Sequence, residues 1–177
     1  VICDKANGFI YVFDGNANLI KKAPALFGKS IGDYLKGEAY TSEQDVDKIT
    51  PAGKFGGAFL GEAFPEERLG MTLTFQQGED ADIAIHRVYL GNPEEKRAER
   101  LTSKDPQTKR ISYGCINVSD KMMDEYILPH FKEGGTVYVM PETEAGRETF
   151  VGFKKPHPHS LDSLIRVAFH NPTDMEI

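Results

Sequence analysis

The chain has 177 residues, a formal net charge of −6 and 40% apolar residues. This length fits one domain with its own hydrophobic core and at most a small appendage. The acidic balance argues against a nucleic-acid-binding domain, which needs a basic surface. No apolar run approaches the roughly 20 residues of a membrane-spanning helix, so the sequence predicts no membrane span.

The chain starts at Val1 rather than at methionine. A removed signal peptide or a trimmed terminus explains this, and we expect an exported protein of the periplasm or cell envelope, with the cytoplasm as the alternative. The two cysteines, Cys3 and Cys115, are able in principle to form a disulfide. Small secreted proteins held by disulfides usually carry more cysteines, so we expect no disulfide here.

Strands are predicted in the first part of the chain. Residues 1–3, 9–13 and 19–20 are rich in β-branched and aromatic side chains, and an Asn-Gly turn at residues 7–8 separates the first two. Together they predict a meander. Residues 28–53 are rich in glycine and charge and predict a long surface loop.

Further strands are predicted at residues 71–75, 82–86 and 136–140. A helix over residues 92–102 starts at an Asn-Pro pair, and its few apolar residues place it on the surface. A second helix, over residues 119–129, carries apolar residues at helical spacing and faces the core. The predicted fold class is therefore mainly β (α+β), with one or two short helices, rather than a doubly wound nucleotide-binding fold.

A cysteine and a histidine far apart in the sequence are candidates for nucleophilic catalysis. Cys115 follows Gly114, whose missing side chain lets a substrate approach the backbone closely, and His86 ends an apolar strand upstream. A thiolate is a strong nucleophile, and an imidazole is well suited to move its proton near neutral pH. The fold must bring two such residues together.

Each of these residues also has a structural interpretation. A cysteine after glycine is often only a small buried apolar residue, and a lone histidine often only fills a hydrogen-bonded position in the core. Ser112 and Asn117 are able to close turns, and Arg110 is a solvated charge unless a substrate carboxylate lies near. Spacing alone leaves these alternatives open.

Three sequence elements, taken together, resemble the catalytic domain of L,D-transpeptidases of the YkuD type. They are Thr-Pro-Ala-Gly-Lys-Phe at residues 50–55, Ile-His at residues 85–86 and Ser-Tyr-Gly-Cys-Ile-Asn at residues 112–117. The opening segment, residues 4–14, is similar to the first hairpin of that domain. The resemblance covers most of the chain.

The resemblance divides the chain and implies its fold. Residues 1–141 are predicted to form the L,D-transpeptidase-like catalytic domain, a β-sandwich, and residues 142–177 a C-terminal extension packed on it or trailing from it. The family acts on peptidoglycan stem tetrapeptides through an acyl-enzyme. An amine acceptor gives transpeptidation, and water gives an L,D-carboxypeptidase. The resemblance implies no metal and no cofactor, with carbapenem β-lactams as inhibitors.

The resemblance also assigns roles to the motif residues. By position, Cys115 is the nucleophile that forms a thioester and His86 is the general base. Gly114 and Cys115 would supply backbone N–H groups to the oxyanion.

Five further residues are predicted to shape or bind the substrate site: Arg87, Arg110, Ser112, Tyr113 and Asn117. Arg87 stands where the family usually has Gly or Ser, so we expect a backbone carbonyl, rather than a side-chain hydroxyl, to orient the histidine. Tyr113 stands where many members have histidine, and its hydroxyl is a candidate hydrogen-bond donor. The stretch between the histidine and the cysteine is longer than in many members and is predicted to form a wall or lid beside the thiol.

A catalytically silent wall-binding module is the alternative from another class of protein. It requires His86 to lie away from Cys115 in the fold. His157 and His159 in the tail are a weak pair of metal ligands and are predicted to be solvated.

Overall fold

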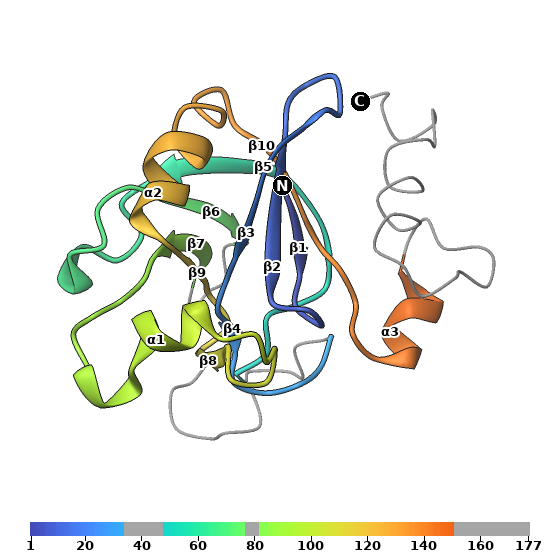
Figure 1. Ribbon diagram of the computed structural model, residues 1–177. Helices are drawn as coiled ribbons and strands as arrows, with labels where there is room; N and C mark the ends of the chain where they lie inside the picture. Colours follow the sequence, from blue (N-terminus) through green and yellow to red (C-terminus); the bar gives the residue numbers. More distant parts are fainter. Residues whose placement is uncertain (34–47, 77–81, 151–177) are drawn as a thin grey trace.

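A computed structural model describes residues 1–33, 48–76 and 82–150. Eight strands form one continuous sheet in the order β3-β2-β1-β10-β5-β6-β7-β9, and β4 pairs with β8 in a small second sheet (Figure 1). The strands are β1 (Ile2–Asp4), β2 (Phe9–Phe13), β3 (Leu19–Pro24), β4 (Phe27–Gly28), β5 (Gly53–Gly61), β6 (Thr72–Gln76), β7 (Ile83–Arg87), β8 (Arg110–Ser112), β9 (Ile116–Val118) and β10 (Gly135–Val139). The helical segments are η2 (Pro65–Glu67), η3 (Pro93–Glu95), α1 (Arg97–Thr102), α2 (Asp120–Met122), η4 (Met123–Ile127) and α3 (Glu144–Thr149).

The amino-terminal strands form the predicted meander. β1 pairs with β2 and β2 with β3, both antiparallel. Gly8 has a φ of +73° at the expected Asn-Gly turn, a conformation that other residues adopt only with strain. The predicted strands at residues 71–75, 82–86 and 136–140 are also confirmed, as β6, β7 and β10.

Two parallel pairings connect segments that are far apart in the sequence. β1 lies beside β10, which pairs on its other side with β5, so the first and last strands join the two halves of the sheet. β7 lies parallel to β9. Parallel neighbours need a crossover connection rather than a hairpin, and residues 88–115 provide it for β7 and β9.

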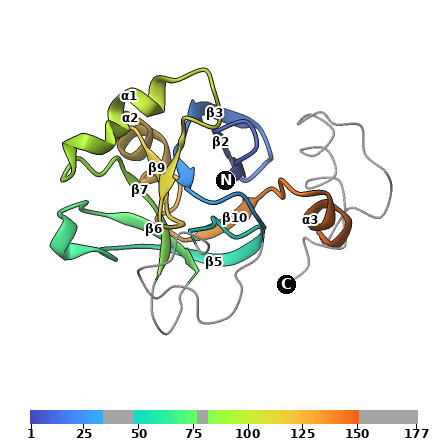
Figure 2. The ribbon, with the colours of Figure 1, turned by 90° about the horizontal axis from the view of Figure 1, so that it is seen from below.

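One hydrophobic core joins the two ends of the sheet. It contains Cys3 and Val12 from the meander, Leu73 and Ile85 from β6 and β7, and Ile116 from β9. Strands from both ends contribute to this single cluster, so the sheet closes over its own core (Figure 2). The predicted fold class, mainly β and sandwich-like with a few short helices, is confirmed.

The predicted helix at residues 119–129 is confirmed, and the one at residues 92–102 is changed. Ser119 caps α2 by accepting a hydrogen bond from the Met122 N–H at 3.2 Å. The earlier helix is interrupted at Lys96, where φ is +50°, and continues as α1. Most of this segment lies on the surface as predicted, but Arg97 is only 7% exposed and bonds to Asn117 of β9.

The expected loop at residues 28–53 lies partly outside the described residues, and the C-terminal extension lies outside them after Phe150. The division of the chain at residue 141 therefore stays a prediction. Within the described part, Asp33 accepts hydrogen bonds from the backbone N–H groups of Glu142 and Thr143, each at 2.8 Å. The first residues of the predicted extension are thus fixed to the body of the protein.

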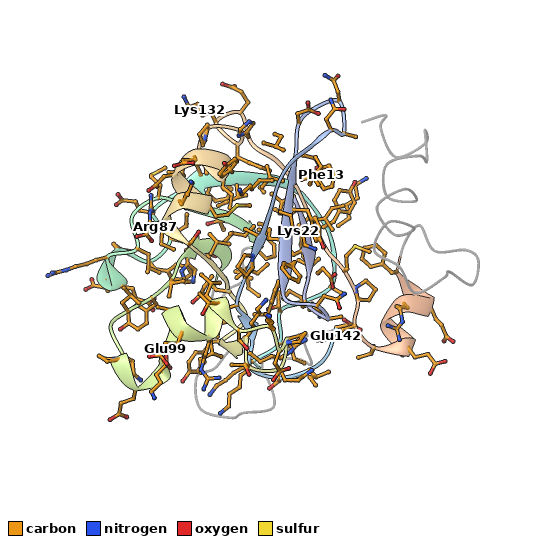
Figure 3. The ribbon with its side chains drawn as sticks, viewed as in Figure 1. Phe13, Lys22, Arg87, Glu99, Lys132 and Glu142 are labelled. Atoms are coloured by element: carbon orange, nitrogen blue, oxygen red, sulfur yellow. The ribbon has the colours of Figure 1, made fainter. Side chains whose placement is uncertain are left out.

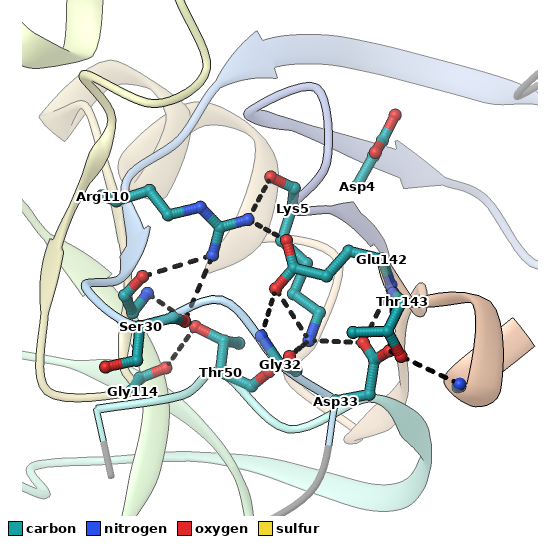
Figure 4. A network of polar contacts seen from close by, with 12 residues as sticks. Asp4, Lys5, Ser30, Gly32, Asp33, Thr50, Arg110, Gly114, Glu142 and Thr143 are labelled. Carbon is teal, nitrogen blue, oxygen red and sulfur yellow. Dashed lines mark hydrogen bonds and ion pairs between the residues drawn. The ribbon is translucent and has the colours of Figure 1, made fainter. Parts of the chain in front are cut away.

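A buried ionic network surrounds this contact (Figure 4). Lys5 Nζ lies 2.9 Å from Asp33 Oδ1, and both side chains are fully buried. Lys5 also donates to the carbonyl oxygen of Thr50 at 2.7 Å. Glu142 pairs with Arg110 and lies 3.6 Å from the Lys5 ammonium. Buried charges are tolerated only when they are paired and hydrogen-bonded, so the members of this network depend on one another.

We expect Asp33→Asn to lower the free energy of unfolding by about 3 kcal/mol, because it leaves the Lys5 ammonium buried with weaker compensation. Urea unfolding followed by circular dichroism measures the change. The control is Glu125→Gln in the exposed pair Lys121–Glu125, whose charged atoms are 3.8 Å apart; it should change the free energy by less than about 0.5 kcal/mol. Similar losses in both variants would contradict the role of the network.

Candidate functional site

The parallel pairing of β7 with β9 sets the geometry of the candidate site. His86 is the register partner of Asn117. Cys115 directly precedes β9, and its thiol donates to the carbonyl oxygen of Asp82, the residue directly before β7, with sulfur and oxygen 3.8 Å apart. Ile85 and Ile116 point to the other side and are buried in the core. The fold therefore brings His86 and Asn117 side by side on one face and sets Cys115 at the start of the strand beside β7.

The hydrogen bonds of His86 define its tautomer. Nδ1 lies 2.6 Å from the carbonyl oxygen of Arg87, which only accepts hydrogen bonds, so Nδ1 carries the proton. Nε2 lies 3.2 Å from Nδ2 of Asn117 and accepts from that amide with its lone pair. The expectation that a backbone carbonyl orients His86 is confirmed. The ring of Phe64 meets the imidazole edge-on, with the ring centroids 5.8 Å apart.

Burial makes the candidate site electrically neutral at rest. Desolvation lowers the pKa of His86 to about 4, the Arg87 carbonyl opposes this shift, and the charge of Arg97 adds to it. Desolvation also raises the pKa of the Cys115 thiol to about 12, although the backbone at Ala84 opposes that shift. At neutral pH a protonated thiol and an uncharged imidazole are therefore present, rather than a thiolate and an imidazolium.

The thiol of Cys115 donates to the carbonyl oxygen of Asp82, with sulfur and oxygen 3.8 Å apart, and it also has a hydrogen bond with the backbone of Ala84. Both cysteines are free, as expected, and Cys3 is completely buried in the core.

The loop before Cys115 is held by its own side chains. Ser112 Oγ accepts from the Gly114 N–H at 3.2 Å and donates to the Cys115 carbonyl oxygen at 2.5 Å. Thr50 Oγ1 donates to the Gly114 carbonyl oxygen at 2.8 Å, which links the loop to the ionic network around Lys5. Gly114 has a φ of +114°, which disfavours any other residue there. The Gly114 N–H already donates to Ser112 Oγ and would have to give up this bond to reach an oxyanion. Of the two predicted oxyanion donors, the Cys115 N–H therefore needs less rearrangement.

Arg110 and Ser112, both predicted to bind substrate, are buried and make contacts within the protein. Arg110 donates to the carbonyl oxygens of Lys5 at 3.1 Å and Gly28 at 3.3 Å, and it pairs with Glu142. Ser112 closes the loop before Cys115, as its alternative interpretation proposed. A contact of either side chain with substrate stays a prediction.

Arg87 and Tyr113 are more accessible. Arg87 lies beside η4 (Figure 3), where it pairs with Asp124 and donates to the carbonyl oxygens of Leu69 and Met71. These bonds hold the connection between β5 and β6, which contains Phe64, the residue whose ring packs against His86. Tyr113 is 57% exposed, and the Lys48 ammonium lies 4.1 Å from its ring centroid.

Two residues that contact the candidate site were missed from the sequence. Arg97 Nη1 donates to Asn117 Oδ1 at 2.8 Å, and Phe64 packs on His86. An arginine in a highly charged helix has the pattern of a solvated residue, and Phe64 precedes a proline that signals only a turn. Neither residue belongs to a motif, so only the fold identifies them.

Within residues 1–33, 48–76 and 82–150, no three His, Cys, Asp or Glu side chains are grouped so that they could bind a metal ion. The same part of the chain contains no helix with the length and apolar character to cross a membrane. His157 and His159 lie outside the described residues.

Comparison with known proteins shows similarity at the level of the fold. No family model matches the sequence, and no curated protein matches it. Similar solved structures include a mutant of the helical cell shape determining protein Pgp2 from Campylobacter jejuni, with a TM-score of 0.54 and 14% identity over 81% of this chain and 47% of that one. They also include an L,D-transpeptidase from Xylanimonas cellulosilytica, with a TM-score of 0.44 and 16% identity over 78% and 58%. This chain thus spans about half the length of Pgp2, with which it shares its fold.

We expect Cys115 to react slowly with iodoacetamide at pH 7, because only the thiolate is alkylated and burial keeps the thiol protonated. The rate should be at least about tenfold lower than in the urea-unfolded protein, where the cysteine has its ordinary pKa. Intact-mass spectrometry over time measures it, with Cys115→Ala identifying any reaction at Cys3. Equal rates in the folded and unfolded protein would show that the thiol is not desolvated.

Proposed function

We propose that this protein is a cysteine acyltransferase of the L,D-transpeptidase type that acts on peptidoglycan stem tetrapeptides. The observation that supports the proposal is the parallel pairing of β7 with β9, which sets His86 opposite Asn117, while Cys115 directly precedes β9. The hydrogen bonds of His86 leave its Nε2 as the basic nitrogen. The fold shared with Pgp2, a cell shape determining protein, supports a substrate in the cell wall and a location in the cell envelope.

The reaction begins at the amide bond between the L-centre of the diamino acid and the terminal D-alanine. Cys115 Sγ attacks the carbonyl carbon, and the thiol proton passes to His86 Nε2. The Cys115 N–H stabilises the oxyanion, a contribution typically worth about 2.7–4 kcal/mol to such a barrier. The carbon–nitrogen bond then breaks, and His86 returns the proton to the departing D-alanine amine. A thioester on Cys115 remains.

The second half of the reaction decides the product. An amine of another stem peptide attacks the thioester carbonyl, gives up its proton to His86 and forms a crosslink; water in the same position releases a tripeptide. Either acceptor restores the thiol. The chemistry at Cys115 is the same for a transpeptidase and for an L,D-carboxypeptidase.

The resting contacts imply that substrate binding rearranges the imidazole. His86 Nε2 accepts from Asn117 in this structure, and it must exchange this hydrogen bond for one from the thiol. Because both catalytic groups are uncharged at rest, proton transfer accompanies attack on a bound carbonyl. This arrangement supports a thiol that becomes nucleophilic only beside its substrate.

Incubation with a stem tetrapeptide should add the mass of the acyl tripeptide to the protein, and a carbapenem should add its own mass. Cys115→Ala should abolish both additions while the circular dichroism spectrum stays that of the wild type. His86→Gln should slow acylation by about 10²–10⁴-fold, the range for loss of a general base. A folded wild-type protein that gains no mass from either reagent would count against the proposal.

The same samples, with and without a D-amino acid or a second stem peptide, identify the acceptor. Exchange of the terminal residue or formation of a dimer would establish transpeptidation. Release of D-alanine without either product would assign the protein as a carboxypeptidase.

A further inference from the structure

A continuous series of polar contacts leads from the crossover segment to the imidazole. Glu95 Oε2 accepts from Arg97 Nε at 2.5 Å, and Arg97 Nη1 donates to Asn117 Oδ1 at 2.8 Å. Asn117 Nδ2 donates to His86 Nε2 at 3.2 Å, and His86 Nδ1 donates to the Arg87 carbonyl oxygen at 2.6 Å. Each donor in this series faces an acceptor.

The position of Arg97 is fixed from several sides. Lys96 adopts a left-handed conformation between η3 and α1, and Arg97 directly after it bonds to Asn117 of β9. Its guanidinium carbon lies 5.4 Å from the ring centroid of Tyr89, and its side chain is 7% exposed. Both ribbon views place α1 beside β9 (Figures 1 and 2). A cation this deeply buried needs paired partners, and here they are Glu95 and Asn117.

The chemistry of arginine decides how Asn117 is oriented. A guanidinium only donates hydrogen bonds, so the amide must turn its oxygen toward Arg97 and its NH₂ group toward His86. An NH₂ group requires a lone pair on Nε2, and the Arg87 carbonyl requires a proton on Nδ1. With Arg97 absent, the amide is free to present its oxygen to Nε2 instead, which favours a proton on that nitrogen.

We propose that Arg97 is a positioning residue that helps to set the tautomer of His86 through Asn117, together with the Arg87 carbonyl. The inference rests on the proposed function of His86 as the general base and deepens it, because a base must hold its lone pair on the nitrogen that faces the reaction. No described contact joins Arg97 to the thiol or to the imidazole, so its effect on the tautomer passes through Asn117, whereas its charge acts on His86 through space. The crossover segment thus supplies part of the catalytic geometry.

The charge of Arg97 also favours the neutral form of His86. Arg97 from α1 disfavours the imidazolium, in addition to burial. Glu95 partly compensates the charge of Arg97 by its ion pair. On β7 itself, the Arg87 guanidinium is paired with Asp124. Removal of Arg97 therefore takes away both the orientation of the amide and a cation that opposes protonation.

The test is a long-range ¹H–¹⁵N NMR spectrum of the full chain, in which the ring nitrogens report the tautomer and titration of each histidine. His86→Gln assigns the signal. In the wild type we expect the Nδ1–H tautomer and a midpoint near 4. In Arg97→Gln we expect a mixture of tautomers and a midpoint higher by about one pH unit or more.

Arg100→Gln is the matched control. Arg100 lies on the same helix and donates to the backbone carbonyls of Glu95 at 2.8 Å and Thr108 at 3.0 Å, without a described contact to Asn117. Its loss removes one positive charge from α1 and should leave the His86 tautomer unchanged. If Arg97→Gln does not fold, Arg97→Met keeps an aliphatic contact with Tyr89 and serves as the test. A folded Arg97 variant with the wild-type tautomer and midpoint would overturn the proposal.

A second arm tests the route through Asn117. In an Asn117→Ala background, Arg97→Gln should produce no further change in tautomer, because the connecting amide is gone; a full-sized further change would overturn the route. In the acylation assay, Arg97→Gln should slow the reaction by about tenfold and move the acidic limb of its pH profile upward. A wild-type protein that is never acylated would refute the proposed function, while the NMR arm would still decide the role of Arg97.

Discussion

The pairing of β7 with β9 is the constraint on which the candidate site depends. The register places His86 opposite Asn117, and Cys115 directly precedes the strand that carries Asn117. The pairing is parallel, so the chain must leave the end of β7 and return to the start of β9 by a long crossover. That crossover contains α1, and its return path brings Arg97 back onto the strand that carries Asn117. One pairing thus positions the thiol, the imidazole, the amide and the arginine.

The surroundings of these strands explain why the site is uncharged. Asn117 is fully buried and His86 nearly so, with Phe64 packed on the imidazole. In such surroundings each ionisable group adopts its neutral form unless a partner stabilises its charge. The thiol lacks a cation in direct contact within the described part of the chain, so it stays protonated. In the proposed reaction, the carbonyl carbon of a bound substrate would accept the sulfur electron pair, and this would make transfer of the thiol proton to His86 favourable.

The sequence predicted most individual elements because their signals are local. Strands with alternating apolar and polar residues, and the helix capped by Ser119, can be predicted from the residues of the element itself. The pairing of β1 with β10 and of β7 with β9 joins distant segments, and turn chemistry says nothing about such contacts. Among the predicted site residues, Ser112 and Arg110 are polar groups near the cysteine, and sequence alone could not separate substrate contacts from support of a loop. The sequence did not identify Arg97 as a site residue, because its burial depends on contacts with Tyr89, Glu95 and Asn117 that form only in the fold.

The charged helix in the crossover predicts a wall or lid beside the thiol, and this stays a prediction. The structure shows a second relation of this segment to the site, because Arg97 donates to Asn117 and Asn117 is bonded to His86. The segment is held by its own polar contacts, with Arg100 donating to the backbone at both Glu95 and Thr108. A change in its length or in the break at Lys96 would move the guanidinium before it disturbed either strand. In the proposed mechanism, His86 Nε2 would then lose the contact that orients it while Cys115 stayed in place, so the shape of this segment would affect the chemistry at His86 and the partly exposed Cys115.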